Sequence, residues 1–215
     1  SDLYDTNGGL RGYCRFEPDE VAAVSGSFVR PGARTLLGEG VFMMTVDQGS
    51  AMDRYQGMTA IEGETLALCA EQYFAQSEQT PTRVRLAVSQ GAGGARAGGV
   101  LIQYIADDDS RGSTLEAWMR TQALFETIGE DELVDPDLST NQLLFRLFHE
   151  DGVRVFDPKD LRAFCRCSQE RIETVLKSFE PAEREDMVEP DGLIHVTCEF
   201  CSKVYAIAPA TLETA

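Results

Sequence analysis

The segment FCRCSQERIETVL, residues 164–176, decides how the last part of this chain folds. Its C-x-C pair, Cys165 and Cys167, stands directly before a pattern that is typical of an amphipathic helix. Ser168 is a suitable N-cap for that helix, because a serine side chain can accept a hydrogen bond from the backbone N–H groups of the first turn. The segment therefore predicts two closely spaced cysteines followed by a short helix.

A second cysteine pair, Cys198 and Cys201, forms a C-x-x-C in the segment HVTCEFCSKVY, residues 195–205. The β-prone residues on both sides predict a hairpin with this pair near its turn. Closed structural zinc sites use four thiolates, and a C-x-x-C turn presents two of them from one tight loop. The two pairs together therefore predict one tetrahedral zinc site. Since few apolar residues lie between 160 and 210, we expect zinc to supply folding free energy, which is about 10–16 kcal/mol in small zinc peptides.

Other interpretations of these cysteines stay open. The simplest is a zinc ribbon whose metal has only a structural role in holding the C-terminal segment folded. A nucleic-acid-binding zinc module is disfavoured, because acidic side chains outnumber basic ones in residues 151–215. A thioredoxin-like dithiol needs its C-x-x-C at the start of a helix, whereas β-prone SKVYAI follows this one. His195 lies close to Cys198 in sequence, but four cysteines already complete the site, so we interpret it as a histidine on the exposed face of a strand.

Composition limits the classes of partner. The chain has 215 residues, and its 36 acidic and 19 basic side chains give a net charge of −17, which repels nucleic-acid phosphates and anionic lipid surfaces. No run approaches the roughly 20 apolar residues of a membrane span, and the first residues, SDLYDTNGGLRG, lack a secretory signal pattern. We therefore expect a cytosolic protein whose partners are proteins or small molecules. In a reducing cytosol, paired cysteines are more often metal ligands or redox-active thiols than permanent disulfides.

The first half of the chain reads as a sheet with one packed helix. Short β-prone runs predict strands, and GETLALCAEQYFAQSEQ, residues 63–79, predicts an amphipathic helix. The strand predictions cover residues 12–16, 41–46, 83–89 and 98–106. Cys69 of the helix and Cys14 have no cysteine neighbour and no basic cluster, so both are predicted to be buried small hydrophobes.

Helical periodicity begins after residue 112. One helix is predicted from Leu115 to Gly129, and a second follows Ser139, whose pairing with Gln142 is a capping-box signature. The run VRVF, residues 153–156, resembles a short strand. These patterns predict an α+β protein with three parts: a sheet-based N-terminal domain over residues 1–107, a helical linker region over 108–152, and a small C-terminal zinc-binding domain over 153–215.

Nothing in the sequence predicts an enzyme. With two histidines and no glycine-framed serine elbow, a Ser-His-Asp hydrolase has little support. His149 lies at the end of a predicted helix, where a cation is favourable without any catalytic role. The glycine-dense stretch at 91–99 is followed by a β-prone run rather than by a helix, so it predicts a hairpin turn and not a phosphate-binding loop.

Several blocks, taken in order, resemble the 33-kilodalton heat-shock protein family of redox-regulated bacterial chaperones. The C-x-C and C-x-x-C pairs follow these blocks, and the ordered set covers almost the whole chain. The blocks are GGLRGYCRF (8–16), YQGMTAIEGETLA (55–67), YFAQSEQTPTRV (73–84), AGGVLIQ (97–103) and LLFRLFHEDGVRVFDP (143–158).

The resemblance implies an ATP-independent holdase chaperone of the stress response and not an enzyme. It implies one Zn²⁺ per reduced chain, with Cys165, Cys167, Cys198 and Cys201 as the ligands. It also implies that oxidation forms the disulfides Cys165–Cys167 and Cys198–Cys201, releases zinc, partly unfolds the chain and turns on binding of unfolded client proteins. Active forms are implied to be homodimers, while the acidic net charge predicts that neither nucleic acid nor a membrane is a partner. A structural zinc protein without a switch and a dithiol oxidoreductase are the alternatives.

The sequence departs from the family pattern at two places. Family chains begin upstream of SDLYDTNGG, so we expect the first strand and helices of the family's N-terminal domain to be missing from this chain. Ser202 follows the C-x-x-C where many members have glycine or asparagine, a change that should not remove zinc.

Overall fold

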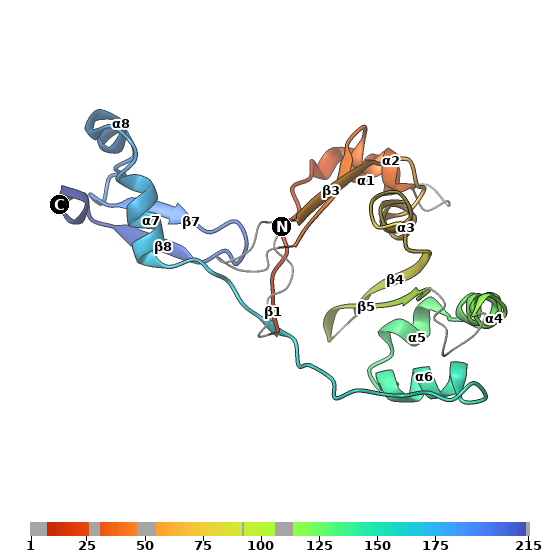
Figure 1. Cartoon of the computed structure of the whole chain (residues 1–215). Coiled ribbons are helices and arrows are strands. Elements are labelled where there is room, and N and C mark those ends of the chain that lie inside the picture. Colours follow the sequence, from red (N-terminus) through yellow and green to blue (C-terminus); the bar gives the residue numbers. More distant parts are fainter. Residues whose placement is uncertain (1–7, 26–30, 47–54, 92, 106–113, 214–215) are drawn as a thin grey trace. The chain divides into compact units, whose positions relative to one another are not determined.

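A computed structural model describes residues 8–25, 31–46, 55–91, 93–105 and 114–213 (Figure 1). The chain divides into two compact units. The terminal unit combines Ser1–Phe16 with Phe156–Ala215, and the central unit is Glu17–Val155. The predicted boundary between residues 107 and 108 falls outside the described residues. The overall class is α+β, with small sheets and short helices, as the sequence predicts.

Two antiparallel hairpins and one helix form the first part of the central unit (Figure 1). β2 (Val41–Val46) pairs with β3 (Tyr55–Ala60), and β4 (Thr82–Gly91) pairs with β5 (Gly94–Gln103). The predicted helix is confirmed as α3 (Leu66–Ser77), which contacts β2, β3 and β4. It buries Cys69, as predicted, and Tyr73. Two short helices, α1 (Pro18–Ser25) and α2 (Ala33–Leu37), precede these elements.

The turn predicted in the glycine-dense stretch is confirmed but is shorter than predicted. β4 ends at Gly91 and β5 begins at Gly94, so most of the glycines belong to β5. Gly98 lies directly against the backbone of Leu133, because a Cβ atom added there would be 1.9 Å from the Leu133 carbonyl oxygen. The glycine therefore serves close backbone packing against α5 (Glu130–Val134) rather than a turn.

The helices described after the hairpins in the central unit are α4 (Leu115–Phe125), α5, and α6 (Thr140–Phe148). The predicted capping box at the start of α6 is confirmed, because Ser139 Oγ accepts from the Gln142 backbone N–H and Gln142 Oε1 accepts from the Ser139 backbone N–H. α4 and α6 contact one another. The helix α5 is not predicted by the sequence, since its few residues complete too little of a 3.6-residue pattern.

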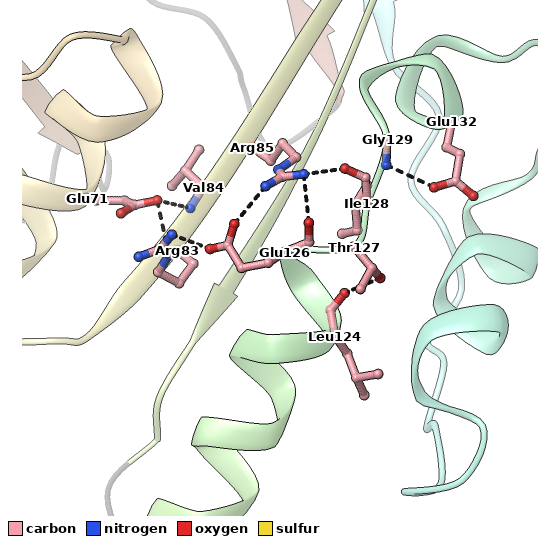
Figure 2. A network of polar contacts seen from close by, with 10 residues as sticks. All are labelled: Glu71, Arg83, Val84, Arg85, Leu124, Glu126, Thr127, Ile128, Gly129 and Glu132. Carbon is pink, nitrogen blue, oxygen red and sulfur yellow. Dashed lines mark hydrogen bonds and ion pairs between the residues drawn. The ribbon is translucent and has the colours of Figure 1, made fainter.

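Charged side chains connect strand β4 to α3 and to the residues after α4 (Figure 2). Arg83 and Arg85 both pair with the Glu126 carboxylate, and the Arg85 guanidinium also donates to the Ile128 carbonyl oxygen. Glu71 of α3 accepts from the Val84 backbone N–H at 2.8 Å. These groups are partly exposed, so each pair adds little stability alone. Together they fix the end of α4 on the β4–β5 hairpin.

The described residues of the terminal unit form small two-stranded sheets and short helices. β1 (Gly9–Leu10) pairs in parallel with β6 (Arg162–Ala163), and β7 (Ile194–Thr197) pairs antiparallel with β8 (Val204–Ile207). The helices are α7 (Gln169–Leu176), α8 (Pro181–Asp186) and α9 (Ala210–Glu213). The helix after Ser168 and the hairpin around the C-x-x-C are therefore confirmed. The core is small and consists of Leu176, Ile194, Tyr205, Ile207 and Leu212.

Two strand predictions and one burial prediction are wrong. Residues 12–16 form no strand, because the ladder with β6 involves only Gly9 and Leu10. Residues 153–156 are not a strand either, and the strand β3 is missing from the sequence predictions. Cys14 is exposed rather than buried, since the segment beyond Leu10 has no neighbouring strand among the described residues to cover it.

Among the described residues, no helix combines the length and the apolar character needed to cross a bilayer.

Candidate metal centre

The fold of the terminal unit brings all four predicted zinc ligands together. The Sγ atoms of Cys165, Cys167, Cys198 and Cys201 all lie within 4.8 Å of one another, and all four cysteines are free thiols. The Sγ atoms of Cys165 and Cys198 are 3.6 Å apart, and those of Cys167 and Cys201 are 3.4 Å apart. A tetrahedral site with Zn–S bonds of about 2.3 Å requires sulfurs that are roughly 3.8 Å apart. The donor set and its size therefore fit a zinc ion.

The C-x-C pair is positioned by the start of α7. Cys165 and Cys167 lie between β6 and α7, and the Ser168 hydroxyl accepts from the Arg171 backbone N–H at 3.3 Å. This is the N-cap that the sequence predicts. Because the cap fixes where the helix begins, it also fixes the direction in which the chain leaves the cysteine pair.

The C-x-x-C pair is positioned by the turn of the β7–β8 hairpin. The Cys198 backbone N–H donates to the Lys203 carbonyl oxygen at 2.9 Å, and the Ser202 N–H donates to the Cys198 carbonyl oxygen at 2.7 Å. Ser202 has a φ of 57°, in the left-handed region that glycine and asparagine adopt most easily. This conformation gives the physical reason why glycine or asparagine suits the position better than serine.

The four sulfurs have different surroundings. Cys167 and Cys198 pack against the apolar core of the unit, whereas Cys201 is exposed. The hydroxyl of Tyr205 on β8 donates a hydrogen bond to Cys167 Sγ at 3.2 Å. No sequence pattern predicts that Tyr205 belongs to the site, although the alternation of the SKVYAI strand places it on one face with the core residue Ile207.

The cluster perturbs the acidity of its own thiols. A hydrogen bond from the Cys167 backbone N–H lowers the pKa of Cys165 to about 6, against the effect of burial. For Cys201, the Lys203 backbone N–H favours the thiolate, but hydrogen bonding with Cys167 and burial outweigh it and raise the pKa to about 12. Four neighbouring sulfurs cannot all be negative unless a cation compensates them. Binding of a divalent metal would therefore release protons.

A cavity of about 420 Å³ lies beside the cluster in the terminal unit, and Cys165 and Cys201 both line it. Two arginines stack on aromatic rings at its wall. The Arg11 guanidinium carbon is 4.2 Å from the centroid of the Phe200 ring, and that of Arg162 is 5.2 Å from the Phe164 ring. The cavity therefore lies against one cysteine of each pair.

The two histidines stay outside the cysteine cluster of the described residues. His149 follows α6 as its C-cap, and its Nδ1 lies 3.0 Å from the Phe145 carbonyl oxygen. His195 lies on β7, as predicted, but its side chain is only 28% exposed because its Nε2 contacts Asp191 Oδ2 at 2.7 Å. Hydrogen bonding to Asp191 raises the pKa of His195, and the same bond lowers the pKa of Asp191.

The His195–Asp191 pair predicts a pH-dependent contribution to stability. The raised pKa of His195 means that its contribution is complete below its ordinary value of 6.5 and is lost as the pH rises through its folded-state pKa. The contribution of Asp191 is complete above its ordinary value of 3.8 and is lost as the pH falls through its lowered folded-state pKa. Thermal melting of the zinc-saturated chain should therefore show His195→Gln to be destabilising at about pH 6 and nearly neutral at about pH 9.

The Asp191→Asn variant is the matched control and should reproduce this loss at about pH 6. Glu189 also raises the pKa of His195, so a small residual difference is expected after Asp191→Asn. An equal effect of His195→Gln at both pH values would contradict the ion-pair interpretation.

Comparison with known proteins identifies the family of this chain. The sequence model of the family described as Hsp33 protein matches residues 3–208, which is nearly the whole chain. The chain belongs to the Hsp33 family. The 33 kDa chaperonin of Caulobacter vibrioides is 69% identical over 210 residues, which cover 96% of this chain and 70% of the relative. That of Azotobacter vinelandii is 39% identical and covers 91% of this chain and 63% of the relative.

The crystal structure of the Hsp33 homologue from Thermotoga maritima shares the fold, with a TM-score of 0.74 at 22% identity. The match covers 97% of this chain and 69% of that one. This chain spans about 70% of the length of the Caulobacter relative. Hsp33 proteins are chaperones, so membership places this chain in a chaperone family and not in an enzyme family.

Proposed function

We propose that this chain is an ATP-independent holdase whose cysteine cluster binds one Zn²⁺ when reduced and acts as a redox switch. The observation that carries the proposal is the set of four free thiols whose Sγ atoms all lie within 4.8 Å of one another. Membership of a chaperone family supplies the activity that the switch would control. An excess of acidic side chains argues against nucleic acid as a partner.

Zinc would be held by Cys165, Cys167, Cys198 and Cys201. When bound, the ion would offset two of the four thiolate charges and join two segments that are distant in sequence. The buried core among the described residues of the terminal unit is small, so this joint would contribute much of its stability. The chain's own residues prepare the site, since Ser168 fixes one cysteine pair at a helix start and the β7–β8 turn fixes the other.

Oxidation by a peroxide or hypochlorous acid would reverse this arrangement. With peroxide, one thiolate attacks an oxygen atom and becomes a sulfenic acid, and hydroxide leaves. The second thiolate of the pair attacks that sulfur and expels a second hydroxide, so each disulfide forms by loss of two electrons to the oxidant. We propose Cys165–Cys167 and Cys198–Cys201 as the bonds. These bonds close very short loops and do not join the two segments, so they constrain little of the chain.

The pairing has a direct test, because close sulfur contacts also connect different pairs. Cys165 is 3.6 Å from Cys198, and Cys167 is 3.4 Å from Cys201. Disulfides between these partners would keep the segments joined and would oppose unfolding. Peptide mapping of the oxidised chain by mass spectrometry should find the bonds within each pair, and bonds between the pairs would contradict the switch.

Loss of the zinc link between the two cysteine pairs would unfold the terminal unit and expose its apolar side chains. Residues such as Leu176, Ile194 and Ile207 are buried in the reduced fold and would become available to unfolded client proteins. The same released surface would favour self-association, and we propose a homodimer as the oxidised form. We also propose that the protein works in the cytoplasm, where reduced thiols and unfolded clients are both present.

Light scattering of a heat-unfolding client protein tests the function. The reduced, zinc-loaded chain should leave aggregation unchanged, and the chain oxidised by peroxide or hypochlorous acid under mild heating should suppress it. Loss of zinc on oxidation without any suppression would favour a purely structural zinc site. Catalytic reduction of insulin disulfides would instead indicate a dithiol oxidoreductase, and either result would contradict the holdase proposal.

A further inference from the structure

We propose that Tyr205 controls the reactivity of one cysteine in the cluster: its hydroxyl restrains the Cys167 sulfur and slows closure of the Cys165–Cys167 disulfide. The inference rests on the proposed redox function and names a residue that would set its rate. Tyr205 would act through Cys167 and is therefore a positioning residue.

The position of Tyr205 is fixed by the core of the terminal unit. It lies in β8 opposite Val196 of β7, and only 7% of its surface is exposed. It belongs to the same buried core as Leu176 and Ile194, and the Lys203 ammonium lies 4.7 Å from the ring centroid. Because the ring is held on several sides, the hydroxyl has little freedom to leave its partner.

The partner of this hydroxyl is the Cys167 sulfur, at a distance of 3.2 Å. The Tyr205 O–H is the donor, so it occupies one lone pair of the sulfur. A hydrogen bond to a charged acceptor is stronger than one to a neutral acceptor, so the bond strengthens as the sulfur becomes a thiolate. Cys167 itself packs against the apolar core, which limits the number of water molecules that could replace the hydroxyl.

The hydrogen bond opposes the step in which Cys167 acts as a nucleophile. In that step, Cys165 has already been oxidised to a sulfenic acid by peroxide. The Cys167 thiolate then attacks the Cys165 sulfur, the S–S bond forms, and hydroxide leaves with the oxygen. The attacking electron pair must be freed from its donor before the bond can form. Removal of the Tyr205 hydroxyl should therefore make Cys167 more reactive without changing the ring that fills the core.

Site-resolved alkylation tests this inference. The reduced, zinc-loaded chain and its Tyr205→Phe variant are treated with iodoacetamide, and modification of each cysteine is followed by mass spectrometry. Alkylation of Cys167 should be about 3- to 10-fold faster in Tyr205→Phe, because groups around metal ligands commonly change site properties by about tenfold or more. Cys198 and Cys201 should change by less than about twofold. A merely structural role would accelerate all the cysteines together.

Tyr13→Phe is the matched control, since it removes a tyrosine hydroxyl from the same unit. The Tyr13 ring packs on Phe200, with centroids 5.8 Å apart, and it is 42% exposed. This variant should leave the alkylation of Cys167 unchanged. An unchanged Cys167 rate in Tyr205→Phe, or equal acceleration at all the cysteines, would overturn the inference.

The same variants separate this inference from the proposed function. In peroxide, the Cys165–Cys167 disulfide should form faster in Tyr205→Phe, with the rate of Cys198–Cys201 closure unchanged. If the oxidised chain fails to hold client proteins while the Cys167-specific acceleration is observed, the holdase proposal is wrong and the role of Tyr205 stands. If the switch works and the acceleration is absent, the role of Tyr205 is wrong and the holdase proposal stands.

Discussion

A Cys165→Ser, Cys198→Ser double variant should lose its zinc and the cooperative fold of its terminal unit. Each pair then keeps a single sulfur, and two thiolates do not complete a closed zinc site. Zinc binding contributes about 10–16 kcal/mol in small zinc peptides at neutral pH, which is more than the stability of most small domains. The core that the described residues of this unit form is too small to replace that contribution.

Metal analysis and hydrogen exchange measure this result. Bound zinc should fall from one ion per chain to nearly none. Amide protection should disappear from α7, β7 and β8, with the central unit unchanged. Cys14→Ser is the matched control, because Cys14 is an exposed cysteine of the same unit that lies outside the cluster, and this variant should keep its zinc.

The double variant also tests the link between unfolding and activity. If zinc clamps the terminal unit in an inactive state, the variant should suppress client aggregation without any oxidant. A reduced double variant that stays folded and does not bind clients would contradict the zinc-clamp account. Suppression only after oxidation would contradict it as well. The variant keeps one cysteine in each pair and therefore cannot form either disulfide within a pair.

A Gly98→Ala substitution should strongly destabilise the central unit. The added Cβ would lie 1.9 Å from the Leu133 carbonyl oxygen and 2.7 Å from its carbonyl carbon. Both atoms belong to the backbone of α5, so no side chain can rotate away to make room. Overpacking of this kind typically costs 1–3 kcal/mol and occasionally more, and we expect about 3 kcal/mol or more here.

Urea unfolding of the central unit, followed by the Trp118 fluorescence, provides the measurement. Gly91→Ala is the matched control in the same hairpin, because nothing lies within 4 Å of a Cβ atom added at Gly91. The control should change the free energy of unfolding by less than about 1 kcal/mol. Equal effects of the two substitutions would show that loss of glycine flexibility, and not contact with α5, limits this hairpin.

The candidate site could largely be predicted because its signals are local. The spacing of the cysteines limits them to two tight turns, and the serine cap and the β-prone flanks identify the elements that carry those turns. The packed environment of the sulfurs could not be predicted. Tyr205 is separated from Cys167 by the whole of α7, α8 and β7, and no local pattern reports that its hydroxyl reaches that sulfur.

Elements whose hydrogen bonds close within a few residues could be predicted from adjacent residues, such as the capped starts of α6 and α7 and the β7–β8 hairpin. Features that depend on distant segments follow from how the folded chain packs. The exposure of Cys14 follows from the short ladder between β1 and β6. The need for glycine at position 98 follows from the approach of α5. Local bonds are encoded by adjacent residues, whereas burial and close backbone contact depend on which segments pack together.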